Sequence, residues 1–213
     1  MAHTPFPDRK AAGRALALQL DDYAGRDDTV VLALPRGGVP VGLEIARRLR
    51  APLNVMIVRK LGVPSQPELA MGAIASGGFR AMNADVVSAS GIPGAQLDKV
   101  IQDELRELDR RERLYRAGRA AVDLKGRTVI LVDDGIATGA TMRVAMQAVR
   151  HARPARLAVG APVMADSALR ELRGEADEVV AVLTPDDLHS IGEWYDDFSQ
   201  LTDREVCGML DDV

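Results

Sequence analysis

Two adjacent aspartates and a loop of small residues form the clearest chemical feature of this sequence. The stretch VILVDDGIATGAT, residues 129–141, starts as an apolar run, reaches Asp133 and Asp134, and continues into a loop without lysine. When such a loop opens a helix, its backbone N–H groups can point into one concavity and bind a phosphate monoester. The missing lysine excludes the Walker A loop, which needs G-x-x-x-x-G-K-[ST]. The predicted phosphate-binding residues are Ala137, Thr138, Gly139, Ala140 and Thr141.

The acid pair suits a sugar diol. Neighbouring side chains diverge at the end of an extended strand, so the two carboxylates need not compete for one proton. They can accept hydrogen bonds from two vicinal hydroxyls, or hold water on a Mg²⁺ ion. A phosphate loop beside such a clamp predicts a ribose 5-phosphate site. An isolated Asp-Asp pair would more simply be solvated, and a receiver-type or nucleotide-binding signalling module is a further alternative.

Two positively charged stretches also follow apolar runs. In PRGG, residues 35–38, Arg36 supplies donors and Gly37 permits close approach of the backbone. Arg59 and Lys60 follow the run LNVMIV. Each stretch could be only a turn or a pair of surface cations. However, ligands of open α/β sheets bind beyond the carboxyl ends of the strands, where these residues would meet the acid pair. A second anion, such as diphosphate, is therefore expected opposite the phosphate loop.

The apolar periodicity predicts an α/β fold with a mostly parallel five-stranded sheet and helices on both faces. The expected strands span residues 29–34, 53–58, 127–132, 156–163 and 178–183. The expected helices span residues 11–20, 40–49, 95–118, 141–152 and 165–173.

Two segments interrupt this alternation. Residues 62–94 are rich in Gly, Pro, Ser and Ala, which predicts a functional or mobile excursion with a hairpin at residues 76–78. The tail, residues 184–213, predicts a small cap. Its aromatic side chains are expected to pack the cap rather than stack on a base; they are Trp194, Tyr195 and Phe198. For the charged helix 95–118, packing on its own domain is favoured over a role in a dimer or partner interface.

Composition limits the remaining choices. The chain has 213 residues and a net charge of −4, which argues against a broad basic surface for nucleic acid. Cys207 is the only cysteine and the three histidines are scattered, so no disulfide or cysteine-based zinc site is expected. No signal peptide or membrane-spanning run is evident. These features predict a cytoplasmic protein with one domain over residues 1–213 and a core at about 28–185.

The motifs together resemble those of type I phosphoribosyltransferases. VILVDDGIATGAT is similar to the signature of that family, an apolar strand followed by an acidic pair and a Thr-Gly-x-Thr loop. PRGG stands where the family has a short diphosphate loop, often with a cis peptide. VRK, residues 58–60, stands where the family has a cation pair before a flexible catalytic loop, which residues 62–82 match in place and composition. The chain most closely resembles uncharacterised bacterial phosphoribosyltransferase-domain proteins, some of them fused to hydrolases.

The resemblance implies transfer of ribose 5-phosphate from 5-phosphoribosyl 1-diphosphate (PRPP) to a nitrogen acceptor, a nucleobase-like small molecule, with release of diphosphate. Asp133 and Asp134 would bind the ribose hydroxyls, and residues 137–141 would bind the 5-phosphate. Mg²⁺ would arrive with PRPP and meet Asp133 or Asp134 only through water. The diphosphate would be bound by Arg36, Gly37, Arg59 and Lys60.

The acceptor and the general base stay open. Hypoxanthine-type members have an acidic residue where this chain has Ala137, whereas the adenine-type members that alanine resembles place a glutamate in the flexible loop. Glu68 is the candidate for that role, two positions from the expected spacing. A regulator on the same fold that binds PRPP without turnover is the alternative function, and a homodimer is an open alternative to a monomer.

Overall fold

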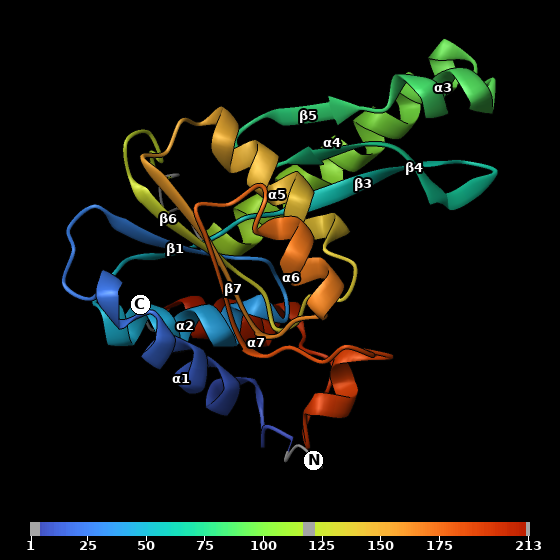
Figure 1. The fold of residues 1–213 in the computed structure, drawn as a ribbon. Helices are drawn as coiled ribbons and strands as arrows, with labels where there is room; N and C mark the ends of the chain where they lie inside the picture. Colours follow the sequence, from blue (N-terminus) through green and yellow to red (C-terminus); the bar gives the residue numbers. More distant parts are fainter. Residues whose placement is uncertain (1–4, 117–121, 212–213) are drawn as a thin grey trace.

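The computed structural model describes residues 5–116 and 122–211, and its main sheet is parallel throughout. Figure 1 shows this sheet with helices on both faces, which confirms the predicted α/β class. Its strands run in the order β2 (Leu53–Val55), β1 (Thr29–Ala33), β6 (Thr128–Val132), β7 (Arg156–Val163) and β8 (Glu178–Leu183).

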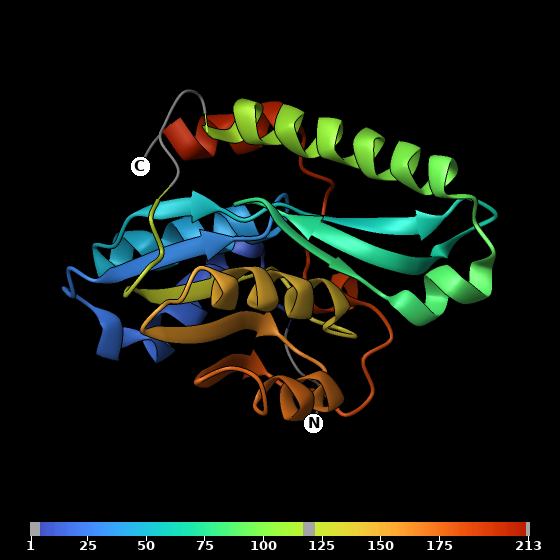
Figure 2. The same cartoon turned by 90° about the horizontal axis from the view of Figure 1, so that it is seen from above.

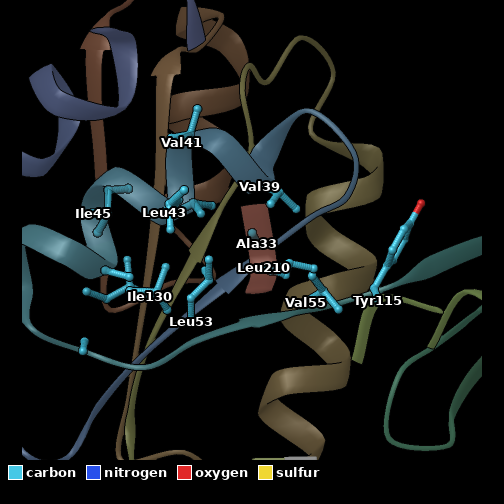
Figure 3. Packing of buried hydrophobic residues seen from close by; sticks show 14 of the residues in the cluster. Ala33, Val39, Val41, Leu43, Ile45, Leu53, Val55, Tyr115, Ile130 and Leu210 are labelled. Atoms are coloured by element: carbon cyan, nitrogen blue, oxygen red, sulfur yellow. The ribbon is translucent and has the colours of Figure 1, made fainter. Parts of the chain in front are cut away.

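Side chains of the central strands alternate between two cores. On β1, Val31 and Ala33 belong to a core shared with α1 (Arg9–Gln19), α2 (Gly38–Leu49) and α7 (Asp203–Asp211), whereas Val30 and Leu32 belong to the opposite core. That second core is shared with α5 (Ala140–His151) and α6 (Asp166–Leu172). Figure 3 shows the first core, where Leu210 of α7 lies near Ala33 and Val55. Burial on both faces explains why the strands read as continuous apolar runs.

The excursion predicted as a flexible loop is a second, antiparallel sheet. It consists of β3 (Val58–Val63), β4 (Gln66–Ala75) and β5 (Phe79–Met82). The predicted hairpin is confirmed: Gly77 and Gly78 connect β4 to β5 with φ of +81° and +78°, which L side chains rarely adopt. The predicted flexible hairpin loop over residues 62–82 consists largely of these strands, and its mobility stays a prediction. The predicted strand 53–58 is likewise divided between β2 and the first residue of β3.

One long helix covers this second sheet. Figure 2 shows α4 (Gly94–Arg116) lying along the sheet, with α3 (Ala84–Ser90) at its outer end. Ile101, Leu108 and Tyr115 form the buried stripe of α4. The helix therefore packs on its own chain, as favoured from the sequence; residues 117–118 of the predicted helix lie outside the described residues.

The C-terminal tail divides into two parts rather than forming one cap. The short helix η2 (Ile191–Trp194) lies beside the N-terminal segment, where Phe6 N donates to Trp194 O at 2.8 Å (Figure 1). The following α7 instead packs on α2 and α4. A second short helix, η1 (Asp21–Tyr23), follows α1. Within the described ranges, no helix combines the length and the apolar character needed to cross a membrane.

Candidate active site at the end of β6

A cavity of about 160 Å³ lies beyond the carboxyl end of β6. The chain leaves β6 after Val132, forms a short loop and enters α5 at Ala140. The cavity has room for roughly five water molecules at about 30 Å³ each, which is enough for a phosphate group and part of a sugar. It is lined by Asp133, Gly135, Ile136, Ala137, Thr138, Gly139, Ala140, Thr141, Met142 and Ile191. The structure therefore gathers the five predicted phosphate-loop residues around one hollow.

The loop is shaped for backbone binding of an anion. Gly139 adopts φ of +70° immediately before α5, and the Ala140 N–H lies 3.4 Å from Thr138 Oγ1. Thr138 and Thr141 are exposed and offer hydroxyl donors. Arg143, one turn into α5, donates to Thr138 O at 3.2 Å and pairs with Glu171, so a cation also stands beside the loop. The sequence interpretation did not single out this arginine.

The two aspartates have different surroundings. Asp133 is the one that lines the cavity, and its Oδ1 accepts a hydrogen bond from the Asp134 N–H at 2.9 Å. Removal from water, and secondly the charge of Asp134, raise the pKa of Asp133 well above its usual value. The Asp134 carboxylate instead accepts a hydrogen bond from Arg9 Nε at 2.6 Å. Of the two predicted ribose-binding residues, Asp133 thus borders the cavity and Asp134 is paired with Arg9, and their binding of a diol stays a prediction.

The PRGG turn packs directly against the acid pair. The peptide between Pro35 and Arg36 is cis, as the resemblance implied. An ideal Cβ on Gly37 would meet the Asp134 carboxylate, with Oδ1 at 2.8 Å and Oδ2 closer still. Gly37 has an ordinary right-handed conformation, with φ of −62°, so close approach rather than backbone freedom requires glycine here. The turn that the sequence placed beside the aspartates is therefore in contact with one of them.

The predicted diphosphate cations are held by carboxylates on other elements. Arg36 Nη1 lies 3.8 Å from Asp203 Oδ1 of α7, and Arg59 donates to Glu104 of α4 at 2.6 Å. Lys60 is exposed on β3. Binding of one diphosphate by these three cations stays a prediction. Asp203, which also accepts from Tyr115 Oη at 2.6 Å, is a charged partner that sequence reasoning missed.

Glu68 is exposed on β4, in the half of the strand farthest from the β4–β5 turn. In the parts of the chain that the structure describes, no hydrogen bond or ion pair joins Glu68 to the residues lining the cavity. The structure therefore adds no geometric support for Glu68 as a general base.

Both ends of the chain contribute to the site. Tyr195 Oη donates to the Asp134 carbonyl oxygen at 2.5 Å, and burial followed by the Asp134 charge raises the pKa of Tyr195. Ile191 of η2 closes one side of the cavity, where its Cγ1 would lie 2.9 Å from a Cβ on Gly135. The aromatic tail was expected to pack, and Tyr195 stacks on Phe198 with ring centroids 5.0 Å apart. Its hydrogen bond to the acid pair could not be predicted from composition.

The donor set fits a metal that arrives with its ligand. Among residues 5–116 and 122–211, no group of three or more His, Cys, Asp or Glu side chains is placed to hold a metal ion. The Asp133 carboxylate can accept a hydrogen bond from a metal-bound water at the cavity wall. Binding of Mg²⁺ together with a phosphorylated ligand stays a prediction.

Comparison with known proteins identifies a family and relatives of this chain. The family described as phosphoribosyl transferase domain matches residues 4–190, a wider range than the 28–185 inferred from the motifs. Two Mycobacterium tuberculosis proteins that carry the name phosphoribosyl transferase, from strains CDC 1551 and H37Rv, are 46% identical over 206 residues. The alignment covers 97% of this chain but only 46% of those proteins, so this chain spans about half their length.

Solved structures show the same architecture. The protein TT1426 from Thermus thermophilus has a TM-score of 0.83 and 40% sequence identity, covering 97% of this chain and 98% of its own. A hypoxanthine phosphoribosyltransferase from Staphylococcus aureus has a TM-score of 0.50 and 13% identity, covering 88% of this chain and 78% of its own. At that identity the second likeness concerns the fold alone.

Proposed function

Because this chain belongs to the phosphoribosyl transferase family, we propose that it transfers ribose 5-phosphate from PRPP to a nitrogen acceptor. The observation that supports this proposal most strongly is the cavity beyond β6, where one carboxylate and a helix-opening loop of small residues share a wall. The loop suits the 5-phosphate, and Asp133 suits the adjacent ribose hydroxyls. The acceptor proposed is a nucleobase-like small molecule.

The chemistry follows from the bond that must break. The bond between the anomeric carbon and the diphosphate oxygen breaks as a bond from the acceptor nitrogen forms, and diphosphate leaves with the electron pair. Charge builds up on the leaving group while the sugar ring becomes cationic, so electrostatic stabilisation lowers the barrier. When bound, Mg²⁺ supplies charge neutralisation for the diphosphate.

The residues of this chain would bind and orient the ribosyl group. Thr138 and Thr141 would donate to the 5-phosphate together with the loop amides. Asp133 would accept a hydrogen bond from a ribose hydroxyl. Arg36 and Arg59 would exchange their present carboxylate partners for diphosphate oxygens. Ala137 offers no acid or base at the position where hypoxanthine-type members have an acidic residue. A group other than residue 137 would therefore accept the proton that the acceptor nitrogen loses.

The test is PRPP binding followed by turnover. Calorimetric titration with PRPP, with and without Mg²⁺, should show binding that Asp133→Asn combined with Asp134→Asn abolishes. A panel of nucleobases should then reveal one that elicits diphosphate release. Binding without release for any member of the panel would favour the PRPP-binding regulator, and the absence of PRPP binding would refute both functions.

A further inference from the structure

Asp134 is held by a side chain from far outside the motif. Arg9 of α1 donates Nε to Asp134 Oδ2 at 2.6 Å across 125 positions of sequence, and the two side chains are only 11% and 14% exposed. Because little solvent screens the pair, its attraction is stronger than that of a surface ion pair. The pair therefore fixes the Asp134 carboxylate against the Gly37 backbone.

Arg9 is itself anchored to the C-terminal segment. Its guanidinium lies 3.9 Å from the centroid of the Phe198 ring, and Nη1 donates to Ser199 O at 2.9 Å. The N-terminal segment lies beside η2 and the residues that follow it (Figure 1), and Phe6 pairs with residues 194–196 through the backbone. The arginine thus has three partners that fix its position, and one of them is an aspartate of the motif.

The peptide of Asp134 connects this anchor to the cavity. Its N–H donates to Asp133 Oδ1 at 2.9 Å, while its carbonyl oxygen accepts from Tyr195 at 2.5 Å. With Oδ1 engaged by this peptide, Asp133 can turn its other oxygen toward a ligand in the cavity that it lines. A shift of the Asp134 carboxylate would move the N–H that orients Asp133.

We propose that Arg9 is a positioning residue for the ribose-binding carboxylate: by holding Asp134 against the Gly37 backbone, it fixes the peptide that aims Asp133 into the cavity. The two aspartates then have unequal roles, since Asp133 contacts the ribose hydroxyls and Asp134 is the anchor. This inference rests on the proposed function, because it assumes a ribosyl ligand in the cavity.

The test compares two ligands that differ by one hydroxyl. Calorimetric titration with ribose 5-phosphate and with 2-deoxyribose 5-phosphate gives a ratio of affinities for each variant of the full chain. Arg9→Gln should weaken ribose 5-phosphate binding by about tenfold, the size expected for one lost charged hydrogen bond, and bring the ratio toward one. Arg9→Lys should retain part of the ratio, because lysine still supplies a charged donor to Asp134.

Two controls separate positioning from stability. Arg14→Gln removes an arginine from the same helix whose side chain is 60% exposed and lies 3.6 Å from Glu44, and it should leave both affinities unchanged. Phe198→Leu removes one of the three partners of Arg9 and leaves the ion pair with Asp134 in place. It should lower the melting temperature while preserving most of the ratio, because Asp134 and Ser199 O still hold the guanidinium.

Separate substitution of the two aspartates tests their unequal roles most directly. Asp133→Asn should abolish discrimination between the two sugars, whereas Asp134→Asn should match Arg9→Gln, and the double variant Arg9→Gln/Asp134→Asn should be no worse than either alone. An unchanged ratio in Arg9→Gln, or Asp134→Asn behaving like Asp133→Asn, would overturn the positioning role while leaving the proposed function intact. Failure of the unaltered protein to bind PRPP or ribose 5-phosphate would overturn both.

Discussion

Gly37→Ala should disturb the site more than its single methyl group suggests. The added Cβ would overlap the Asp134 carboxylate, with Oδ1 at 2.8 Å, and a real Cβ essentially never comes within 3.0 Å of another heavy atom. The carboxylate cannot simply move away, because Arg9 holds Oδ2 at 2.6 Å in a pair with little exposure. Therefore either the turn after β1 must shift or the ion pair between Arg9 and Asp134 must break.

The expected loss of stability follows from these two ways of accommodating the methyl group. Overpacking costs about 1–3 kcal/mol, and breaking a well-buried ion pair costs about 3–5 kcal/mol. A loss of about 2–3 kcal/mol is expected for this partly buried pair, which corresponds to a melting temperature lower by roughly 4–12 °C for a chain of 213 residues. PRPP affinity should also fall by at least about tenfold, because the displaced turn and aspartate both border the site.

Differential scanning calorimetry and PRPP titration check this prediction. The matched control is Gly208→Ala on the exposed side of α7, where an ideal Cβ meets nothing within 4 Å. That change should stabilise the protein by about 0.5–1 kcal/mol, because glycine is unfavourable inside a helix. If Gly37→Ala melted like the unaltered protein and bound PRPP equally well, the contact between the turn and Asp134 would be wrong.

Three further predictions concern the same end of the sheet. Asp133→Asn should stabilise the protein increasingly as pH rises above about 4, by up to about 1.4 kcal/mol per pH unit, because the native state retains a proton that the unfolded chain releases; thermal melts from pH 4.5 to 8 would contradict this if the two proteins kept a constant difference. Thr141→Val removes a hydroxyl from the cavity wall and should weaken PRPP binding by about tenfold without a change in melting temperature; equal affinity in calorimetry would exclude Thr141 as a phosphate donor. Tyr195→Phe deletes the hydrogen bond to Asp134 O and should lower the melting temperature by roughly 2–4 °C, from about 1 kcal/mol; an unchanged melt would show that this bond adds nothing to stability.

The central strands of the main sheet were predictable because they are buried on both faces. The run at residues 156–163 coincides with β7, where all residues after Arg156 are buried, since helices on either side select an unbroken apolar sequence. The run at residues 178–183 coincides with β8, an edge strand whose residues are half-buried. The second sheet was less evident, because its glycines suggested a loop. Gly72 of β4 shows the reason: a Cβ there would meet Ala81 O and, at 3.2 Å, Met82 Cα of the adjacent strand. Glycine in this strand serves close packing, which composition alone cannot distinguish from flexibility.

The candidate site was also predictable from the sequence only in part. The cavity wall from Asp133 to Thr141 is continuous in sequence, so one motif was enough to predict that these residues meet. Arg9 and Tyr195 lie 125 and 61 positions away from Asp134. A single arginine at the start of an amphipathic helix looks like any surface cation, and only the tertiary contact between the terminal segments gives it a partner in the motif.

Arg36, which is proposed to bind diphosphate, has a weak carboxylate partner in this structure. Arg36 and Asp203 are 39% and 36% exposed and lie 3.8 Å apart, a separation and exposure typical of a weak surface pair worth at most about 1 kcal/mol. In the proposed complex, a diphosphate oxygen would replace Asp203 as the partner of Arg36. The same exchange at Arg59 would release Glu104 and loosen the tie between β3 and α4. Binding of the leaving group would thereby be coupled to the position of the second sheet, which holds the residues that the sequence predicted as a flexible hairpin loop.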